Sequence, residues 1–266
     1  MITISSRKNK LIKQVKSLHR KKNRNEEGLF LIEGLRIINE AQTEDVQIKY
    51  VFVSDSFVNK NKSDKIKFDI EKRAKEIVQI PDDIFKYISE TENPQGILAV
   101  LKQMNYNEDE IINKGDFFLI IEEISDPGNL GTIIRTSDAG NVSGVFLTEG
   151  CVDIYNSKVI RSTMGSIFRV PTVYTSDVKD LIEKLNNHNV NVFASCVKGG
   201  SPYTKCDFTD KCAIIIGSES LGAEEKTIRS SDQIVSIPMP GGAESINASV
   251  AAGILIYEVV RQRNIL

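Results

Sequence analysis

The chain is poor in the residues that hold metals and form disulfides. Its 266 residues include four cysteines and two histidines, and no two cysteines form a Cys-x-x-Cys pair. This scarcity argues against a zinc site, so we expect no metal in the functional site. The four thiols are expected to be reduced and partly buried, as in a cytoplasmic protein.

Long apolar segments are missing as well. The longest apolar run lies near residues 248–260, which is too short to span a membrane and contains Glu258. The N-terminal stretch MITISSRKNK is basic and lacks the apolar core of a secretory signal. We therefore expect a cytoplasmic protein without a membrane partner.

Two nucleotide-binding fingerprints are absent. The sequence has no Gly-x-Gly-x-x-Gly. The stretch from Gly217 to Gly222 continues with Ala-Glu, where a phosphate loop needs Lys followed by Ser or Thr. These absences exclude the phosphate-loop interpretation and leave a dinucleotide-dependent oxidoreductase as the weakest alternative.

Acidic residues are missing from the first 25 positions, which contain nine Lys and Arg. Residues 1–105 carry 20 basic and 15 acidic side chains, whereas residues 106–266 carry 14 and 21. A basic block on a nearly neutral chain suggests a polyanionic partner, whose binding would weaken steeply with salt. A solvated basic helix explains the same charge without any partner.

Residues 1–105 predict a small α+β unit. Apolar residues at helical spacing indicate helices within 9–22 and 35–42. Branched and aromatic runs indicate strands at 28–34, 48–54, 77–81 and 96–102. The polar, acidic stretch 106–115 predicts a linker.

Residues 116–266 predict an α/β domain with a parallel sheet. Near-continuous apolar runs are typical of strands that are buried on both faces. They lie at 117–124, 144–149, 190–197, 212–219 and 233–238. Helical segments are expected between and after them, at 131–139, 157–168, 176–187 and 248–263.

Ligands of α/β domains bind beyond the carboxyl ends of strands, and three such ends carry polar loops. In the first, Asn129 lies in a turn and Arg135 is expected about one turn inside the following helix, facing the same mouth. The planar guanidinium of Arg135 suits phosphate recognition. A turn asparagine beside a surface arginine is the simpler alternative.

The second loop places Glu219 between Gly217 and Gly222, and the third runs MPGGAESINAS into a helix. Glu219 could anchor the neighbouring loops, or it could be a surface acid at a helix start. Helix capping explains either Ser245 or Asn247. It does not explain a Glu, a Ser and an Asn together after two glycines.

The three loops together resemble the three motifs of the SpoU/TrmH branch of the SPOUT RNA methyltransferases. The matching stretches are Asn129-Leu-Gly-Thr-Ile-Ile-Arg135, then Ile216-Gly-Ser-Glu219 with Gly222, then Ile237-Pro-Met through Glu-Ser-Ile-Asn-Ala-Ser-Val-Ala-Ala252. The first hundred residues resemble the substrate-binding domain of RNA 2′-O-ribose methyltransferases. This resemblance implies a trefoil-knotted C-terminal domain, a homodimer through that domain, and methyl transfer from S-adenosylmethionine to a ribose 2′-hydroxyl.

The resemblance also implies residue roles. Main-chain groups of Gly217, Ile237 and Ile246 should hold the cofactor; Ile246 replaces the more frequent Leu, a change that backbone contacts tolerate. The polar catalytic set comprises Asn129, Arg135, Glu219, Ser245 and Asn247. Within it, Arg135 acts either as the base or as a clamp for phosphate and alkoxide, and Glu219 has a structural role. The predicted RNA-contacting cations are Arg7, Lys8, Lys10, Arg20, Lys21, Lys22 and Arg24.

The resemblance further implies ribosomal RNA, specifically large-subunit (23S) rRNA, as the substrate, because shorter relatives that act on tRNA usually lack such an N-terminal substrate-binding domain. No DNA partner is expected. Two alternatives stay open. One is a tRNA ribose 2′-O-methyltransferase. The other is a catalytically silent RNA-binding protein that acts in ribosome assembly.

Overall fold

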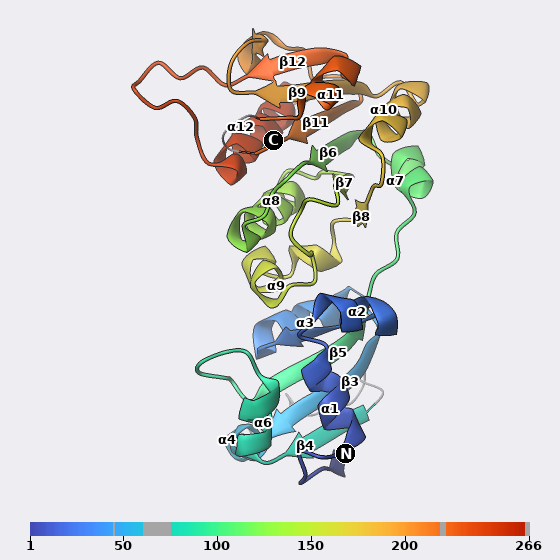
Figure 1. Ribbon diagram of the computed structural model, residues 1–266, viewed down its shortest axis with the longest axis vertical. Coiled ribbons are helices and arrows are strands. Elements are labelled where there is room, and N and C mark those ends of the chain that lie inside the picture. Colours follow the sequence, from blue (N-terminus) through green and yellow to red (C-terminus); the bar gives the residue numbers. More distant parts are fainter. Residues whose placement is uncertain (45, 61–75, 219–221, 264–266) are drawn as a thin grey trace. The chain divides into compact units, whose positions relative to one another are not determined.

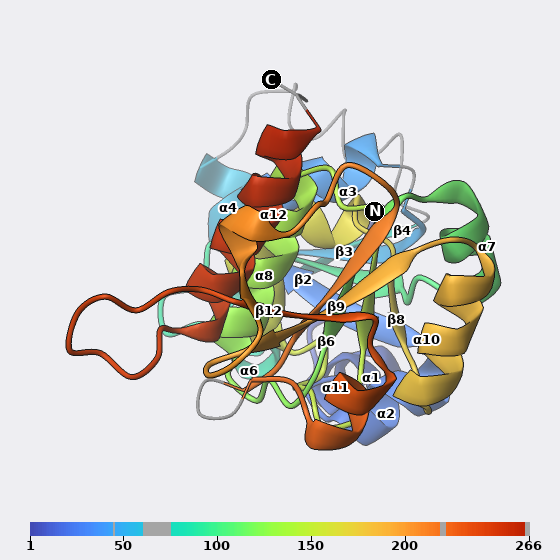
Figure 2. The same cartoon turned by 90° about the horizontal axis from the view of Figure 1, so that it is seen from above.

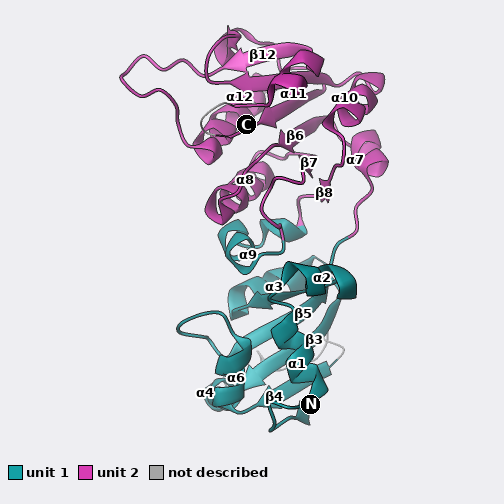
Figure 3. Ribbon diagram, viewed as in Figure 1, with its two compact units in different colours: residues 1–104, 155–168 teal, residues 105–154, 169–266 magenta. Residues whose placement is uncertain are grey.

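The computed structural model describes residues 1–44, 46–60, 76–218 and 222–263 (Figure 1). The chain divides into two compact units, which Figure 3 distinguishes by colour. Unit 1 comprises residues 1–104 and 155–168, and unit 2 comprises residues 105–154 and 169–266. Across the described ranges, no helix is long and apolar enough to cross a membrane.

Unit 1 contains a five-stranded mixed sheet in the order β1-β4-β3-β5-β2. Its strands are β1 (Ile2–Thr3), β2 (Leu29–Glu33), β3 (Ile48–Ser54), β4 (Glu76–Ile80) and β5 (Ile97–Lys102). The pairs β1/β4 and β3/β4 are parallel, whereas β3/β5 and β2/β5 are antiparallel. The four strands predicted from the sequence are confirmed, and β1 is an additional short edge strand.

Helices cover the sheet of unit 1. They are α1 (Lys10–Ser17), α2 (Lys21–Glu27), α3 (Leu35–Thr43), α4 (Asp55–Lys60) and α6 (Asp82–Ile88). Helix α1 buries Ile12 and Val15 in a core that also includes Phe52 of β3 and Phe85 of α6. The amphipathic spacing of α1 therefore places its lysines on the outer side.

The helix predicted within residues 9–22 is two helices, because the chain turns at Leu18–Arg20. Arg20 is extended, with φ −94° and ψ 130°. The guanidinium of Arg24 donates hydrogen bonds to the carbonyl oxygens of Leu18 and His19, at 2.8 and 2.9 Å. These carbonyls follow the end of α1, where helical partners run out. Arg24 thus stabilises the break between the two helices.

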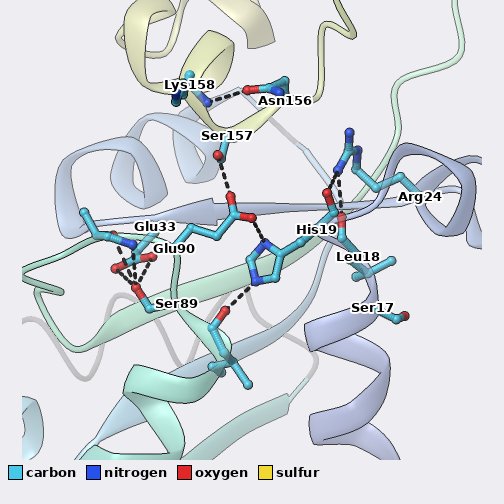
Figure 4. Close-up of polar contacts among 12 residues, drawn as sticks. Ser17, Leu18, His19, Arg24, Glu33, Ser89, Glu90, Asn156, Ser157 and Lys158 are labelled. Carbon is cyan, nitrogen blue, oxygen red and sulfur yellow. Dashed lines mark hydrogen bonds and ion pairs between the residues drawn. The ribbon is translucent and has the colours of Figure 1, made fainter.

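Residues 155–168 belong to unit 1, although they lie within the range predicted as the C-terminal domain. They form α9 (Ser157–Thr163) and a 3₁₀ turn, η1 (Ser166–Phe168). The ring of Tyr155 lies 4.5 Å from that of Phe30 on β2. Ser157 Oγ donates to Glu90 Oε2 at 2.7 Å, and Glu90 Oε1 lies 3.1 Å from His19 Nδ1 (Figure 4).

Unit 2 contains a seven-stranded sheet in the order β10-β12-β9-β11-β6-β7-β8, and every pair in it is parallel. Its strands are β6 (Phe117–Ile121), β7 (Gly144–Leu147), β8 (Thr172–Tyr174), β9 (Asn191–Cys196), β10 (Ser201–Pro202), β11 (Cys212–Ile216) and β12 (Gln233–Ser236). All residues of β6 and β11 are buried. The parallel α/β prediction is confirmed, and β8 and β10 are additional strands; the trefoil knot stays a prediction.

The elements outside this sheet are α7 (Glu108–Lys114), α8 (Pro127–Ala139), α10 (Val178–Asn187), η2 (Tyr203–Lys205), α11 (Glu225–Ser230) and α12 (Ala248–Gln262). Helix α7 occupies most of the stretch predicted as a linker, and it buries Ile111 and Ile112. Helices α8 and α12 lie side by side (Figure 2). They approach closely at Gly140, where an added Cβ would lie 2.2 Å from Ile256.

Candidate active site

The first polar loop leads from β6 into α8, which begins at Pro127. Asp126 caps this helix, because its Oδ1 accepts a hydrogen bond from the Asn129 amide at 2.8 Å. The prediction that the helix begins at residue 131 is therefore wrong. Arg135 is exposed and lies about two turns inside α8, rather than one.

Asn129 and Asn247, from the first and third loops, form a hydrogen bond. Asn247 Nδ2 donates to Asn129 Oδ1 at 2.9 Å. Asn247 Oδ1 accepts from the backbone N and the Oγ of Ser249, at 2.9 and 2.6 Å. The two donors of Ser249 fix which end of the Asn247 amide faces Asn129, because an amide has one accepting end. Sequence reasoning missed this role of Ser249, although Asn-x-Ser at a helix start is a readable capping signal.

The three predicted cofactor-binding residues line one pocket of unit 2. This pocket lies between the ends of β9 and β11 and the start of α12. Its lining residues are Ser195, Cys196, Val197, Ile216, Gly217, Gly222, Ile237, Met239, Ser245, Ile246, Ala248 and Ala251. Most of these side chains are apolar or small, so a ligand in this pocket would have to find many of its hydrogen-bond partners on the main chain.

Gly217 and Gly222 are required where two chain segments cross at this pocket. An added Cβ at Gly217 would lie 1.8 Å from the carbonyl oxygen of Gly222. Gly222 has a φ of +76°, and an added Cβ there would lie 2.6 Å from the Ser195 carbonyl oxygen. A side chain at either position would therefore displace the backbone that shapes the pocket.

The third loop touches this pocket only with its two ends. The segment between β12 and α12 projects away from the rest of unit 2 (Figures 1 and 2). Gly241 and Gly242 have no atom within 4 Å of an added Cβ, so they make no close approach to another segment. Ser245 lines the pocket and Asn247 contacts Asn129.

Glu219, a predicted catalytic residue, lies outside the described residues. Within the described residues, the side chain of Arg135, another predicted catalytic residue, forms no hydrogen bond with Asn129, Ser245 or Asn247. Arg135 follows Asn129 by six residues on α8, which turns the two side chains to different sides of the helix. The cluster that the described part of the chain assembles therefore comprises Asn129, Ser245, Asn247 and the pocket beside the start of α12.

A different cavity, of about 480 Å³, opens at the carboxyl ends of β6 and β7 and beside the start of α11. Its lining includes the acids Glu122, Glu123, Glu149, Asp177 and Glu224, against the cations Lys179 and Lys226. Burial raises the pKa of the Glu122 carboxyl, although hydrogen bonds from Thr227 and the Glu224 amide oppose this shift. Such a lining disfavours a polyanion.

Six of the seven predicted RNA-contacting cations are exposed on unit 1. Arg24 is the exception, since it is 5% exposed and its guanidinium donates to backbone carbonyls. Its inclusion among the RNA contacts is therefore corrected: Arg24 is a structural residue. Charge alone could not reveal this, because a buried capping arginine and a surface arginine look identical in a basic stretch.

The chain matches two family models. Residues 116–257, more than half of the chain, match the SpoU rRNA Methylase family. The chain belongs to the SpoU rRNA methylase family. Residues 9–99 match the MRM3-like substrate binding domain. As a SpoU methylase, the chain is an RNA methyltransferase that uses S-adenosylmethionine.

Three known proteins that resemble this SpoU methylase differ in how much of the chain they match. The 23S rRNA (guanosine(2553)-2′-O)-methyltransferase RlmP of Bacillus subtilis is 34% identical, over 97% of this chain and 99% of its own. A crystal structure of an AdoMet-bound rRNA methyltransferase from Sinorhizobium meliloti has a TM-score of 0.85 at 27% identity, and covers 97% of both chains. A TrmH/SpoU tRNA modifying enzyme of A. aeolicus has a TM-score of 0.52 at 25% identity, and covers 59% of this chain and 81% of its own.

The chemistry of the pocket lining in this SpoU methylase suits S-adenosylmethionine, because apolar walls and main-chain groups can bind an adenosine. Its enclosed space is about 50 Å³. Pockets for small molecules usually hold roughly 300–1,000 Å³. The described pocket is therefore smaller than the pockets that usually hold a whole small molecule.

Proposed function

We propose that this SpoU methylase methylates a ribose 2′-hydroxyl in large-subunit (23S) ribosomal RNA. The proposal rests on the share of this chain that each relative matches. The relative named as a 23S rRNA methyltransferase covers 97% of the chain, including the basic N-terminal unit. The tRNA modifying enzyme covers 59%. The substrate-binding unit is thus associated with rRNA enzymes.

The cofactor pocket provides the first step of the proposed mechanism. Gly217, Ile237 and Ile246 would hold the cofactor through main-chain groups, and their common pocket supports this assignment. When bound, S-adenosylmethionine supplies an activated methyl group. The residues around it then have to align the ribose hydroxyl, and alignment alone can be worth an effective molarity of about 10⁵ M or more.

The amide pair would position the substrate. Asn247 and Asn129 are locked to each other, and Ser245 lies at the edge of the same pocket. These three groups would orient the ribose, with Asn247 also fixing the start of α12. Glu219, in the second motif, would anchor the neighbouring loops.

Arg135 would act on the developing alkoxide. A guanidinium is a fixed cation, so it stabilises negative charge and clamps phosphate more readily than it removes a proton. Its exposed place on α8 leaves it open to an RNA phosphate. An RNA phosphate beside Arg135 would also be needed for it to act as the base.

We also propose a cytoplasmic homodimer that forms through a trefoil-knotted unit 2. Helix α12 exposes Val250 and Tyr257, at 51% and 50%. The two residues are seven positions apart, so they share one side of the helix. This apolar side is available for a second copy. Sedimentation velocity tests the proposal, and a monomer at micromolar concentration would contradict it.

The substrate is tested by mapping ribose methylation across rRNA and tRNA from cells with and without the gene. One 23S rRNA ribose should lose its methyl group when the gene is deleted and regain it on complementation. Purified protein and labelled cofactor should then methylate the matching rRNA fragment. Loss of a tRNA methyl group instead would favour the tRNA alternative, and an unchanged map would favour the catalytically silent one.

A further inference from the structure

The ring of Tyr87 on α6 is the centre of a cluster that the active site does not use. Tyr87 is 38% exposed. The guanidinium carbon of Arg7 lies 5.5 Å from the ring centroid, and Lys16 Nζ lies 5.3 Å from it. All three residues belong to unit 1. Cations within about 6 Å of a ring centroid are attracted to its face.

Arg7 is held beside this ring by an ion pair. Its Nη2 donates to Asp83 Oδ2 at 2.7 Å and to the Asp83 carbonyl oxygen at 3.2 Å. Asp83 lies four residues before Tyr87 on α6, so both occupy the same side of the helix. The pair holds the planar guanidinium next to the ring, and the Asp83 carboxylate offsets its charge.

Lys16 supplies the uncompensated charge. It lies on α1, which packs against α6. Over the described part of the chain, Lys16 forms no ion pair with a carboxylate. The segment around it carries Lys8, Lys10 and Lys13 and no acid. A phosphate near the ring would therefore meet a net positive surface.

We propose that Tyr87, Arg7 and Lys16 form a subsite for an unpaired RNA nucleotide. The base would stack on the tyrosine ring or on the guanidinium plane, and Lys16 would bind an adjacent phosphate. Bases within a duplex are already stacked, so this chemistry selects a loop, bulge or single strand. The subsite rests on the proposed function for its RNA partner, and adds a contact made apart from the methylated ribose.

Fluorescence anisotropy with the full chain tests the subsite. The probes are a labelled 12-nucleotide oligouridine and a labelled 12-base-pair RNA duplex. Tyr87→Ala should weaken binding of the single strand about tenfold, because loss of one stacked base costs roughly that much. Tyr87→Phe should bind like the wild type, since the ring is retained. Duplex binding should change less than twofold in both variants.

A salt series separates stacking from charge. Tyr87→Ala should weaken single-strand binding by the same factor at every salt concentration. Lys16→Ala should reduce the slope of log affinity against log salt by about one. The matched control is Lys86→Ala, an exposed lysine next to Tyr87 in sequence. It removes the same charge and should leave the ratio of single-strand to duplex affinity unchanged.

Wild-type single-strand affinity in Tyr87→Ala would overturn the subsite, and so would an equal loss in Tyr87→Phe. The proposed function can fail separately. If the wild type methylates rRNA and Tyr87→Ala keeps both the wild-type KM and single-strand binding, the subsite fails and the function stands. If the wild type methylates no rRNA ribose while Tyr87→Ala still loses single-strand binding, the function fails and the subsite stands.

Discussion

The two units present their polar residues in different ways. In unit 2, an all-parallel sheet brings loops from distant parts of the chain to one edge, where Asn129 meets Asn247. In unit 1, a mixed sheet supports helices whose exposed sides carry lysines and arginines. Topology assembles a specific site in the first case, whereas local helix amphipathicity spreads charge over a surface in the second.

This difference predicts a separation of roles. Changes in the unit 2 cluster or at Arg135 should alter cofactor binding or methyl transfer, and should lower RNA affinity by no more than the one phosphate contact proposed for Arg135. Changes on unit 1 should alter RNA affinity or the stability of that unit, with cofactor binding unchanged. The variants below test the separation, from the largest expected effect to the smallest.

Arg135→Ala should lower methyl transfer at least about 100-fold, because loss of one group that stabilises developing charge commonly costs this much. S-adenosylmethionine binding, measured by calorimetry, should survive. The matched control is Arg229→Ala, an exposed unit 2 arginine that pairs with Glu225. Near-normal turnover in Arg135→Ala would rule out the catalytic assignment.

Gly217→Ala should weaken cofactor binding at least about tenfold, because even one added carbon must displace the Gly222 backbone. Gly241→Ala is the matched control, since its added carbon meets open space. Calorimetry gives the cofactor affinity, and RNA affinity serves as the check on unit 1. Equal cofactor affinity in the two variants would contradict the proposed pocket.

Asn247→Asp separates helix capping from the amide pair. The carboxylate can still accept from Ser249, but it cannot donate to Asn129 Oδ1. Turnover should fall about tenfold, as expected when a hydrogen bond worth about 1–1.5 kcal/mol is lost from a positioning group. The thermal unfolding midpoint should stay near that of the wild type. If turnover is unchanged, the amide pair has no part in positioning.

Arg24→Ala and Lys22→Ala compare a buried arginine with an exposed lysine of the same basic segment in unit 1. Arg24→Ala should lower the free energy of unfolding by about 2 kcal/mol, because charge-assisted hydrogen bonds in the interior are lost. Lys22→Ala should leave stability unchanged, because its ion pair with Glu26 is exposed. It should instead reduce the salt dependence of RNA binding. Urea unfolding measures the stability of the two variants, and salt titrations of RNA binding measure the charge effect. Equal stability of Arg24→Ala and Lys22→Ala would contradict the structural role of Arg24.

Cys196 lines the proposed cofactor pocket and offers a thiol-labelling test of it. Burial raises the pKa of the Cys196 thiol, so its alkylation should quicken as pH rises toward and past 9. S-adenosylmethionine should slow this labelling several-fold. Cys212 is the internal control, since burial raises its pKa to about 12 and it should label only on unfolding. Labelling of Cys196 unaffected by the cofactor would place the cofactor elsewhere.

The strands of four or more residues could be predicted from the sequence, because apolar runs such as FFLII are buried whichever neighbours they have. The short strands β1, β8 and β10 carry too few apolar residues to be recognised. The start of α8 could not be predicted, since the sequence predicts a turn at Asn129 and the preceding Pro127 and Gly128 also suit a turn. Proline is equally suited to the first helical position, and Asp126 caps it. Helix α7 did carry a signal within the predicted linker: Asn107 accepts from the amides of Asp109 and Glu110, and an acidic first turn follows.

The polar motifs predicted a common edge of the sheet, and the Asn129–Asn247 contact agrees with that geometry. Arg24 shows the limit of such reasoning, since its burial depends on where α1 ends. The placement of α9 shows another. Buried Val159 and Ile160 predict an apolar helix side, but no local pattern tells which of two sheets that side will cover.

The chain passes between the two units three times, at residues 104–105, 154–155 and 168–169. A protein cut at the first of these points would lose Tyr155, the aromatic partner of Phe30 on β2. A hybrid enzyme that borrows its N-terminal unit from a relative would therefore need the relative's equivalent of residues 155–168 as well. Each unit is built from separate stretches of the sequence, so its pieces would have to be exchanged together.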